Sequence, residues 1–204
     1  MKYGLVAMAM PLFLDRSVCK YLREDGVLVD KKMKKGFRQE YKAIVSRTPG
    51  LAKDNWLLST LYLGCYLISI HKAAPDIITE KRFERLIRAL CEEIERRQKE
   101  SDEAFDEKNI IKRKTASEKS QISTHEMDWV STFKQHSADE YEFTYTKCGL
   151  CELGKREGCF HLIKYLCMSD YITFNKSGAR LVRDHTIANG DGYCDFHVFR
   201  KEKK

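Results

Sequence analysis

Cysteines are concentrated near the end of this chain, and they are its clearest sign of chemistry. Five of the eight cysteines lie in the last third of the sequence. They are Cys148, Cys151, Cys159, Cys167 and Cys194. A deprotonated thiol can bind a metal, exchange disulfides or attack an electrophilic carbon. Zinc binding, redox chemistry and nucleophilic or acid–base catalysis therefore all remain open for this cluster.

Cys148 and Cys151 have the spacing at which two thiolates can grip one tetrahedral zinc ion. Cys159 or His161 could supply further ligands, but a second spaced pair of cysteines is missing. The same two thiols could form a redox site, which in thioredoxin-type proteins lies where a strand leads into a helix. Here residues 152–158 separate the pair from the next helical pattern, which argues against a redox site of this type. The missing second pair of cysteines argues against zinc.

Catalysis is the third possibility. Cys167 and Asp170 are three positions apart in a helical pattern and so share one face. Cys194 precedes Asp195 on a predicted strand, where alternation places their side chains on opposite faces. We predict that these four residues converge on one pocket, which for Asp195 requires a bulge or the end of the strand. Each cysteine by itself is better explained as a small buried residue, and it is the constellation as a whole that favours catalysis.

The first half of the chain is predicted to be helical. Helices are expected over residues 12–22, 53–71 and 79–99, and Asp30 can cap another that ends before Pro49. The helix over 53–71 is apolar on nearly all sides, so we expect it to be the central, most buried one.

The second half changes its period. Residues 128–135, 140–148, 180–188 and 193–200 are predicted strands, with a helix over 159–170 between the strand pairs. A turn at 189–192 is predicted to join the last two strands. This pattern predicts an α+β fold in which helices pack on a four-stranded antiparallel sheet of β-β-α-β-β order.

The organisation that follows is a single domain in two halves. Residues 1–97 form the helical half, residues 98–126 a charged and exposed connection, and residues 127–204 the cysteine-rich half that carries the site. The connection has few apolar residues and so is expected to bury little surface, with a helical part around residues 104–112.

Composition limits the classes of partner. Charged residues make up 33% of the 204 residues, and the net charge of +7 comes from basic residues interspersed with acidic ones. This favours a solvated surface over nucleic-acid binding. The apolar stretch over 56–70 is too short for a membrane span, and the one over 5–14 lacks a cleavage site of secretory type. Cysteines within apolar patterns indicate buried thiols in a cytoplasmic protein.

One part of the sequence resembles a known family. The segment Cys167-Met168-Ser169-Asp170 is followed about ten residues later by the run from Arg180 to Phe196, which contains Thr186, Gly190 and Cys194-Asp195-Phe196. Over residues 140 to 200 this pattern resembles the L-2-amino-thiazoline-4-carboxylic acid hydrolase family. Cys148 falls where that family tends to carry a further cysteine.

The resemblance implies a hydrolase that opens a small cyclic amidine at a non-peptide carbon–nitrogen bond. The family's named reaction converts a 2-aminothiazoline ring into an N-carbamoyl-cysteine. Cys167 or Cys194 would attack the amidine carbon, and Asp170 or Asp195 would pair with the amidinium. The implied substrate-binding positions are Cys148, Arg183, His185 and Thr186.

The expected partner is a small-molecule substrate, with no cofactor or metal, no nucleic acid and no membrane, in a possible homo-oligomer. The alternative function is a non-catalytic small-molecule or zinc-binding sensor module that uses the same pocket.

Overall fold

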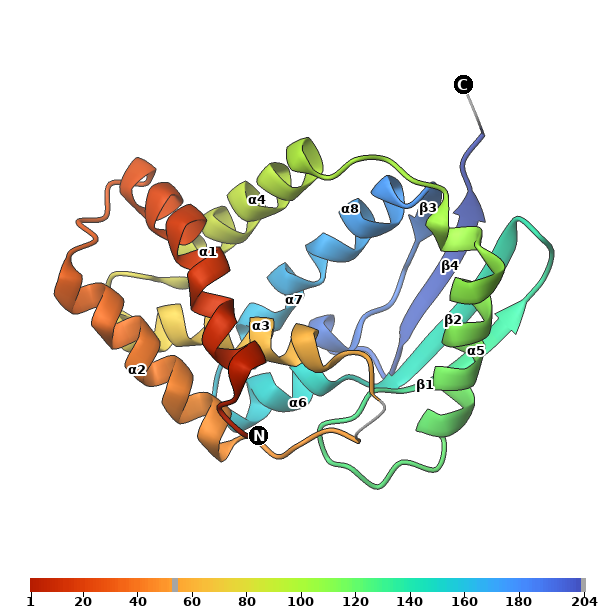
Figure 1. Cartoon of the computed structure of the whole chain (residues 1–204), viewed down its shortest axis with the longest axis horizontal. Helices are drawn as coiled ribbons and strands as arrows, with labels where there is room; N and C mark the ends of the chain where they lie inside the picture. Colours follow the sequence, from red (N-terminus) through yellow and green to blue (C-terminus); the bar gives the residue numbers. More distant parts are fainter. Residues whose placement is uncertain (53–54, 203–204) are drawn as a thin grey trace.

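Helices gather at one end of the molecule and a four-stranded sheet lies at the other (Figure 1). The structure is a computed structural model that describes residues 1–52 and 55–202. The first helices are α1 (Leu5–Glu24), α2 (Lys31–Arg47), α3 (Leu58–Ala73) and α4 (Glu80–Arg97). The predicted α+β class is confirmed.

Local sequence explains where the first helices begin. Asp30 caps α2 as predicted, because its Oδ1 accepts a hydrogen bond of 2.7 Å from the Met33 N–H. The predicted start of the third helix at residue 53 lies outside the described residues, and α3 begins at Leu58. Leu61, Cys65 and Ile68 of α3 have no exposed surface, which confirms α3 as the central helix.

Shortening a side chain at the centre of α3 is expected to destabilise the fold strongly. Leu61→Ala removes fully buried methyl groups and leaves a cavity, which should cost about 2–5 kcal/mol of the free energy of unfolding. Urea unfolding measures the loss. Exposed Ser59 of the same helix provides the control, since Ser59→Ala should change stability by less than about 0.5 kcal/mol. Equal stability of the two variants would contradict the central position of α3.

The charged stretch over 98–126 is more ordered than its composition suggests. It contains the 3-10 helix η1 (Glu103–Phe105) and α5 (Glu107–Ser120), and the side chains of Phe105 and Ile110 are buried. The Ser117 hydroxyl donates a 2.6 Å hydrogen bond to the Ser131 carbonyl, which ties α5 to the first strand. The expected exposed connection is therefore in part a helix that covers the sheet. Composition does not reveal this packing, because a few apolar and hydroxyl side chains at the right positions are enough to hold α5 on the sheet.

The sheet has the order β1-β2-β4-β3, and all neighbouring strands are antiparallel. Its strands are β1 (Val130–Gln135), β2 (Glu140–Lys147), β3 (Ala179–Val182) and β4 (Cys194–Arg200). Between the strand pairs lie α6 (Gly149–Arg156), α7 (Phe160–Leu166) and α8 (Met168–Lys176). Three short helices thus replace the single predicted helix.

The connection between the last two strands differs from the prediction. β3 ends at Val182, six residues before the predicted end, and the 3-10 helix η2 (Ile187–Asn189) follows in the loop. Gly190 ends η2 with a φ of 101°, in the left-handed region that favours glycine. The segment 189–192 is therefore the end of a 3-10 turn and not the tight hairpin turn that was expected.

One face of the sheet is packed against helices and the other is open. On the packed face the Phe143 and Phe196 rings stack at 4.5 Å between centroids, and Phe174 of α8 lies over them. Alternation along β4 places Cys194 on this packed face and Asp195 on the open one. None of the helices in the described parts of the chain combines the length and hydropathy needed to cross a bilayer.

Candidate active site

The first cysteine of the cluster lies where a strand leads directly into a helix. β2 ends at Lys147, Cys148 is the N-cap residue of α6, and the helix begins at Gly149. No helix is predicted from the sequence between the strand that ends at residue 148 and residue 159, so that expectation is wrong. Two glycines, Gly149 and Gly154, weaken the helical pattern of this short segment.

Gly149 is required for this junction by close packing. A Cβ atom at this position would lie 2.3 Å from the Met127 carbonyl oxygen and 2.6 Å from the Trp129 ring. Only glycine lets the start of α6 approach that backbone. The position of Cys148 is therefore set by packing between α6 and the residues that precede β1.

Cys148 differs from the other seven cysteines in its protonation. A hydrogen bond with the Cys151 thiol lowers the pKa of Cys148, and the backbone N–H groups of Cys151 and Leu150 act in the same direction against the effect of burial. The Cys151 partner responds in the opposite sense, since this hydrogen bond and burial raise the pKa of Cys151. Of the two thiols, Cys148 is therefore the one more readily deprotonated, and it lies at the positive end of a helix.

The two thiols that the sequence analysis favours as nucleophiles remain protonated. Burial raises the pKa of Cys167, which lies between α7 and α8, and nearby Asp170 raises it further. Burial also raises the pKa of Cys194 to about 11, although the Ile187 N–H donates to its Sγ at 3.2 Å. Neither thiol has the charge of a resting nucleophile.

Asp170 and Arg183 form an ion pair beside these thiols. The Arg183 Nη1 donates to Asp170 Oδ2 at 2.7 Å, and its Nη2 donates to the Cys167 carbonyl at 3.0 Å. The Arg183 side chain is only 3% exposed and packs against the rings of Tyr171 and Phe196. Arg183 is thus enclosed and has the geometry of a residue that positions Asp170.

Asp170 keeps accessible surface in spite of its depth. Its side chain is 37% exposed, yet burial is the main influence on the carboxyl and raises the pKa of Asp170 against the effect of Arg183. Its Oδ1 makes no hydrogen bond with any residue that the structure describes, so this oxygen can accept one from a ligand.

The structure brings one set of expected site residues together and separates another. Cys148, Cys167 and Cys194 are all within electrostatic range of Asp170. Asp195 lies on the open face of the sheet, where its Oδ1 accepts a 2.6 Å hydrogen bond from the His185 N–H. No bulge turns Asp195 inward, because β4 pairs in regular register with β2.

The remaining two expected site residues belong to the loop before β4. The His185 side chain is 46% exposed, and its Nδ1 lies 3.4 Å from Asp195 Oδ2. The Thr186 N–H donates to Asp191 Oδ2 at 2.7 Å, which closes the turn around η2. Both residues therefore have structural partners of their own in this loop.

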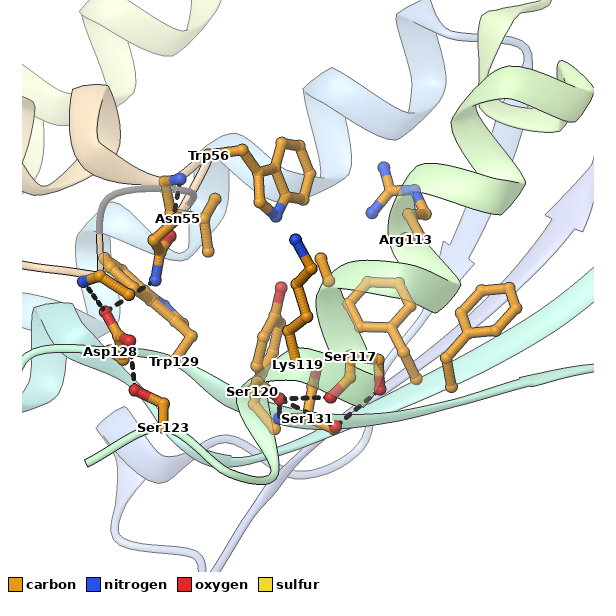
Figure 2. A pocket seen from close by; sticks show the side chains of 16 residues that line it. Asn55, Trp56, Arg113, Ser117, Lys119, Ser120, Ser123, Asp128, Trp129 and Ser131 are labelled. Atoms are coloured by element: carbon orange, nitrogen blue, oxygen red, sulfur yellow. Dashed lines mark hydrogen bonds between the residues drawn. The ribbon is translucent and has the colours of Figure 1, made fainter. Parts of the chain in front are cut away.

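A pocket next to Tyr145 opens to the surface. It contains about 640 Å³ of empty space, including the part that is open to solvent, and lies between α5, residues 52 and 55–57, and the packed face of the sheet. Figure 2 shows Trp56 and Arg113 pointing into it from different elements. The Asp128 carboxylate holds one wall in place by accepting from the Ala52 N–H at 3.1 Å and from Asn55 Nδ2 at 2.9 Å (Figure 2).

Tyr145 connects the pocket with the cysteine cluster. Its ring lines the pocket, and its side chain packs against both hydrophobic cores of the protein. Burial raises the pKa of Tyr145, and Arg113, Asp170 and Cys148 all act on its hydroxyl. Arg113 and Cys148 therefore both lie within electrostatic range of one residue in the pocket wall.

Comparison with known proteins agrees with this arrangement. A family model described as L-2-amino-thiazoline-4-carboxylic acid hydrolase matches residues 59–198. The chain belongs to this family. Among curated proteins and among solved structures, none matches the chain.

The match to the hydrolase family runs from α3 to β4 and so contains the whole cysteine cluster. It also contains residues that the sequence analysis missed, above all Arg113. This guanidinium lies over the rings of Trp56, Phe143 and Phe174, at 5.1–5.6 Å from their centroids. Among the described residues, Arg113 has no carboxylate partner. Its place within a highly charged stretch concealed it, because only the packing of α5 shows which basic side chain points inward.

Possible metal ligands gather elsewhere in this member of the hydrolase family. Within the described residues, His136, Glu142 and His197 form the one group of three such side chains with ligand atoms within 4.8 Å of one another. His197 lies on β4 with its side chain on the open face of the sheet, opposite to Cys194. Cys148 and Cys151 gain no third ligand from Cys159, whose Sγ lies 3.5 Å from the Glu157 carbonyl oxygen.

A second and larger cavity is lined mainly by apolar side chains. It contains about 1190 Å³ of empty space between α1, α3 and α4. Leu150 of α6 and Ser169 of α8 reach its wall, each directly before a residue of the cysteine cluster. The apolar lining suits a hydrophobic ligand better than a charged one.

Proposed function

We propose that the protein is a hydrolase that opens a small cyclic amidine bearing a carboxylate, of the 2-aminothiazoline-carboxylate type, at a non-peptide carbon–nitrogen bond. The observation that carries the proposal is a half-buried thiol of lowered pKa, Cys148, close to a carboxylate with a free oxygen, Asp170. Membership of the hydrolase family supports hydrolytic opening of a ring of this type, and the bond that breaks is part of the proposal.

Cys148 is the nucleophile in this proposal, in place of Cys167 or Cys194. Its thiolate adds to the amidine carbon and forms a carbon–sulfur bond. The ring nitrogen takes up a proton and leaves, which opens the ring. Water then adds to the same carbon, the bond to Cys148 breaks, and the free enzyme returns with a carbamoyl product. One water is consumed for each ring that opens.

Asp170 orients the amidine. A carboxylate can accept N–H groups of an amidinium, and Oδ1 is available for this while Arg183 holds Oδ2. The positive charge of the bound amidinium offsets the burial that raises the pKa of Asp170. Arg183 acts as a positioning residue, since its enclosed side chain leaves it no surface for the substrate.

Arg113 is the proposed receptor for the substrate carboxylate. Arg113 lies in the wall of the pocket and forms no ion pair with a carboxylate that the structure describes. Its charge acts on both Tyr145 and Asp170. A carboxylate bound at Arg113 would direct the ring toward the cysteine cluster past Tyr145.

Turnover of 2-aminothiazoline-4-carboxylate by the reduced protein tests this function. We expect the substrate to disappear and a carbamoyl product of one added water to form. Cleavage of the ring carbon–nitrogen bond leaves a new primary amine, whereas the N-carbamoyl product of the family's named reaction requires the ring sulfur to leave as a new thiol. Amine and thiol reagents distinguish these products. Absence of turnover by folded, reduced protein would contradict the proposal.

The pH dependence of catalysis should report on Cys148. The thiolate form is the active one, so kcat/KM should rise with pH through the pKa of Cys148, below the value of about 8.5 for an ordinary thiol. Cys151→Ala removes the hydrogen bond that lowers this pKa, so the rise should move to higher pH. Cys159→Ala, outside the cluster, should leave it in place. If kcat/KM rises over the same pH range in the unchanged protein, in Cys151→Ala and in Cys159→Ala, the assignment of the active thiolate to Cys148 is contradicted.

The alternative, a non-catalytic sensor module, is favoured by one specific observation, the apolar cavity between α1, α3 and α4. Such a module would bind a small hydrophobic molecule there or zinc at the cysteines. Native mass spectrometry and metal analysis of the purified protein test it. A stoichiometric ligand or zinc ion, together with absence of turnover, would support the module.

A further inference from the structure

We propose that Cys148 and Cys151 form a reversible dithiol–disulfide pair, and that its oxidation switches the active site off. The formation of the disulfide rests on the geometry of the β2–α6 junction. Its consequence for catalysis rests on the proposed function, in which Cys148 is the nucleophile.

The geometry of the junction allows the two sulfur atoms to bond. Cys148 is the N-cap residue of α6, and the Glu152 N–H donates to its carbonyl at 3.0 Å, which closes the first helical turn. Residues three apart in such a turn have Cα atoms about 5 Å apart. This lies within the range that a disulfide spans without movement of the backbone.

The two sulfur atoms differ in access, as an attacking and a resolving thiol must. Cys148 is intermediate in exposure, whereas Cys151 is 1% exposed. A reagent therefore meets Cys148 first. A mixed bond formed there is then open to attack from within the protein by Cys151.

The other thiols of the cluster are less suited to be the partner. Cys194 accepts a hydrogen bond from the Ile187 N–H, which orients its sulfur toward the loop around η2. Cys167 lies between two helices, and Arg183 binds its carbonyl oxygen, so movement of its backbone would disturb the ion pair with Asp170. Only Cys151 belongs to the same helical turn as Cys148.

The exchange needs a low-molecular-weight disulfide as oxidant, and glutathione disulfide is the probe. The Cys148 thiolate attacks one sulfur atom of the probe, forms a mixed disulfide and releases one thiolate. Cys151 then loses its proton and attacks the Cys148 sulfur, which forms the internal bond and releases the second thiolate. Two protein thiols are oxidised and one glutathione disulfide is reduced to two glutathione molecules. The oxidised protein has no thiolate at Cys148 to attack an amidine.

Equilibration of the full chain in glutathione buffers of increasing oxidised fraction tests the proposal. After acid quenching and alkylation, peptide mapping should show a bond between Cys148 and Cys151 whose yield follows the redox buffer and returns to zero with dithiothreitol. Turnover should fall in proportion to that yield. A Cys151→Ser variant, which lacks the resolving thiol, should instead accumulate glutathione on Cys148. Circular dichroism checks that this variant folds, and Cys159→Ser is the matched control that should behave like the unchanged protein.

The outcomes separate this inference from the proposed function. A stable mixed disulfide on Cys148 in the unchanged protein, or an internal bond to Cys167 or Cys194, would overturn the inference. The same holds if no bond forms at any ratio of the buffer. Formation of the Cys148–Cys151 bond in a protein that never turns over the amidine would uphold the redox pair and reject the hydrolase.

Discussion

Cys148→Ala is expected to lower kcat/KM for 2-aminothiazoline-4-carboxylate by at least about a hundredfold, since the nucleophile is lost. The reason is that Cys148 is the one cysteine whose pKa is lowered, by its hydrogen bond with Cys151 and by the N–H groups at the start of α6. The measurement is steady-state turnover at the optimal pH, with the fraction of folded protein determined separately.

Two matched variants distinguish this result from general damage to the cluster. Cys167→Ser and Cys194→Ser change thiols whose pKa is raised by burial, so turnover should fall by less than about tenfold in each. Cys194→Ser still offers an acceptor to the Ile187 N–H. Full activity of Cys148→Ala, with loss of activity in either serine variant, would transfer the role of nucleophile to that residue.

Asp170→Asn is the second change with a large expected effect. The amide keeps the shape of the carboxylate but removes the charge that pairs with the amidinium, so kcat/KM should fall by roughly 10²–10⁴-fold. The same change leaves the enclosed Arg183 without its ion-pair partner, which should cost about 1–3 kcal/mol of folding stability because Asp170 is itself partly exposed. Turnover and urea unfolding measure the two effects on the same preparation.

Asp195→Asn is the control for Asp170→Asn. Both residues are aspartates of the family-like segment, but Asp195 lies on the open face and binds the N–H groups of Asp184 and His185. An asparagine there can still accept one of these hydrogen bonds, so turnover should change by less than about tenfold. If Asp195→Asn abolished turnover while Asp170→Asn did not, the site would have to lie on the other face of the sheet.

Measurement of kcat and KM distinguishes a positioning role of Arg183 from direct binding of the substrate. Arg183→Lys keeps the charge near Asp170 but cannot hold Oδ2 and the Cys167 carbonyl with one planar group. A positioning role predicts a fall in kcat with little change in KM, whereas direct binding of the substrate carboxylate predicts a rise in KM.

Periodic patterns accounted for most of the fold before the structure was known. A spacing of three and four residues marked α2 and α4, and an all-apolar segment marked α3 as central, because burial on every side leaves no position for charge. Alternation marked the four strands and placed Cys194 on the packed face. These features depend on neighbours along the chain, which a sequence displays directly.

Short elements escaped the same reasoning. α6 has only eight residues and includes Gly149 and Gly154, so its helical pattern is weak, although packing on Met127 and Trp129 holds it in place. β3 is four residues long and ends where the loop around η2 begins. Tertiary contacts outweigh local propensity in such elements.

The sequence by itself determined that the chain is an α+β protein with a cysteine-rich second half and a family-like segment that includes Cys167, Asp170 and Cys194. Only the tertiary structure decided which thiol has a lowered pKa and which carboxylate faces the cluster. The lowered pKa of Cys148 depends on its place at the start of α6. The position of the Arg113 side chain in the pocket wall depends on the packing of α5 over the sheet. The pKa of a thiol and the direction of a side chain are set by groups that are distant in the sequence, so residue types and spacing do not contain them.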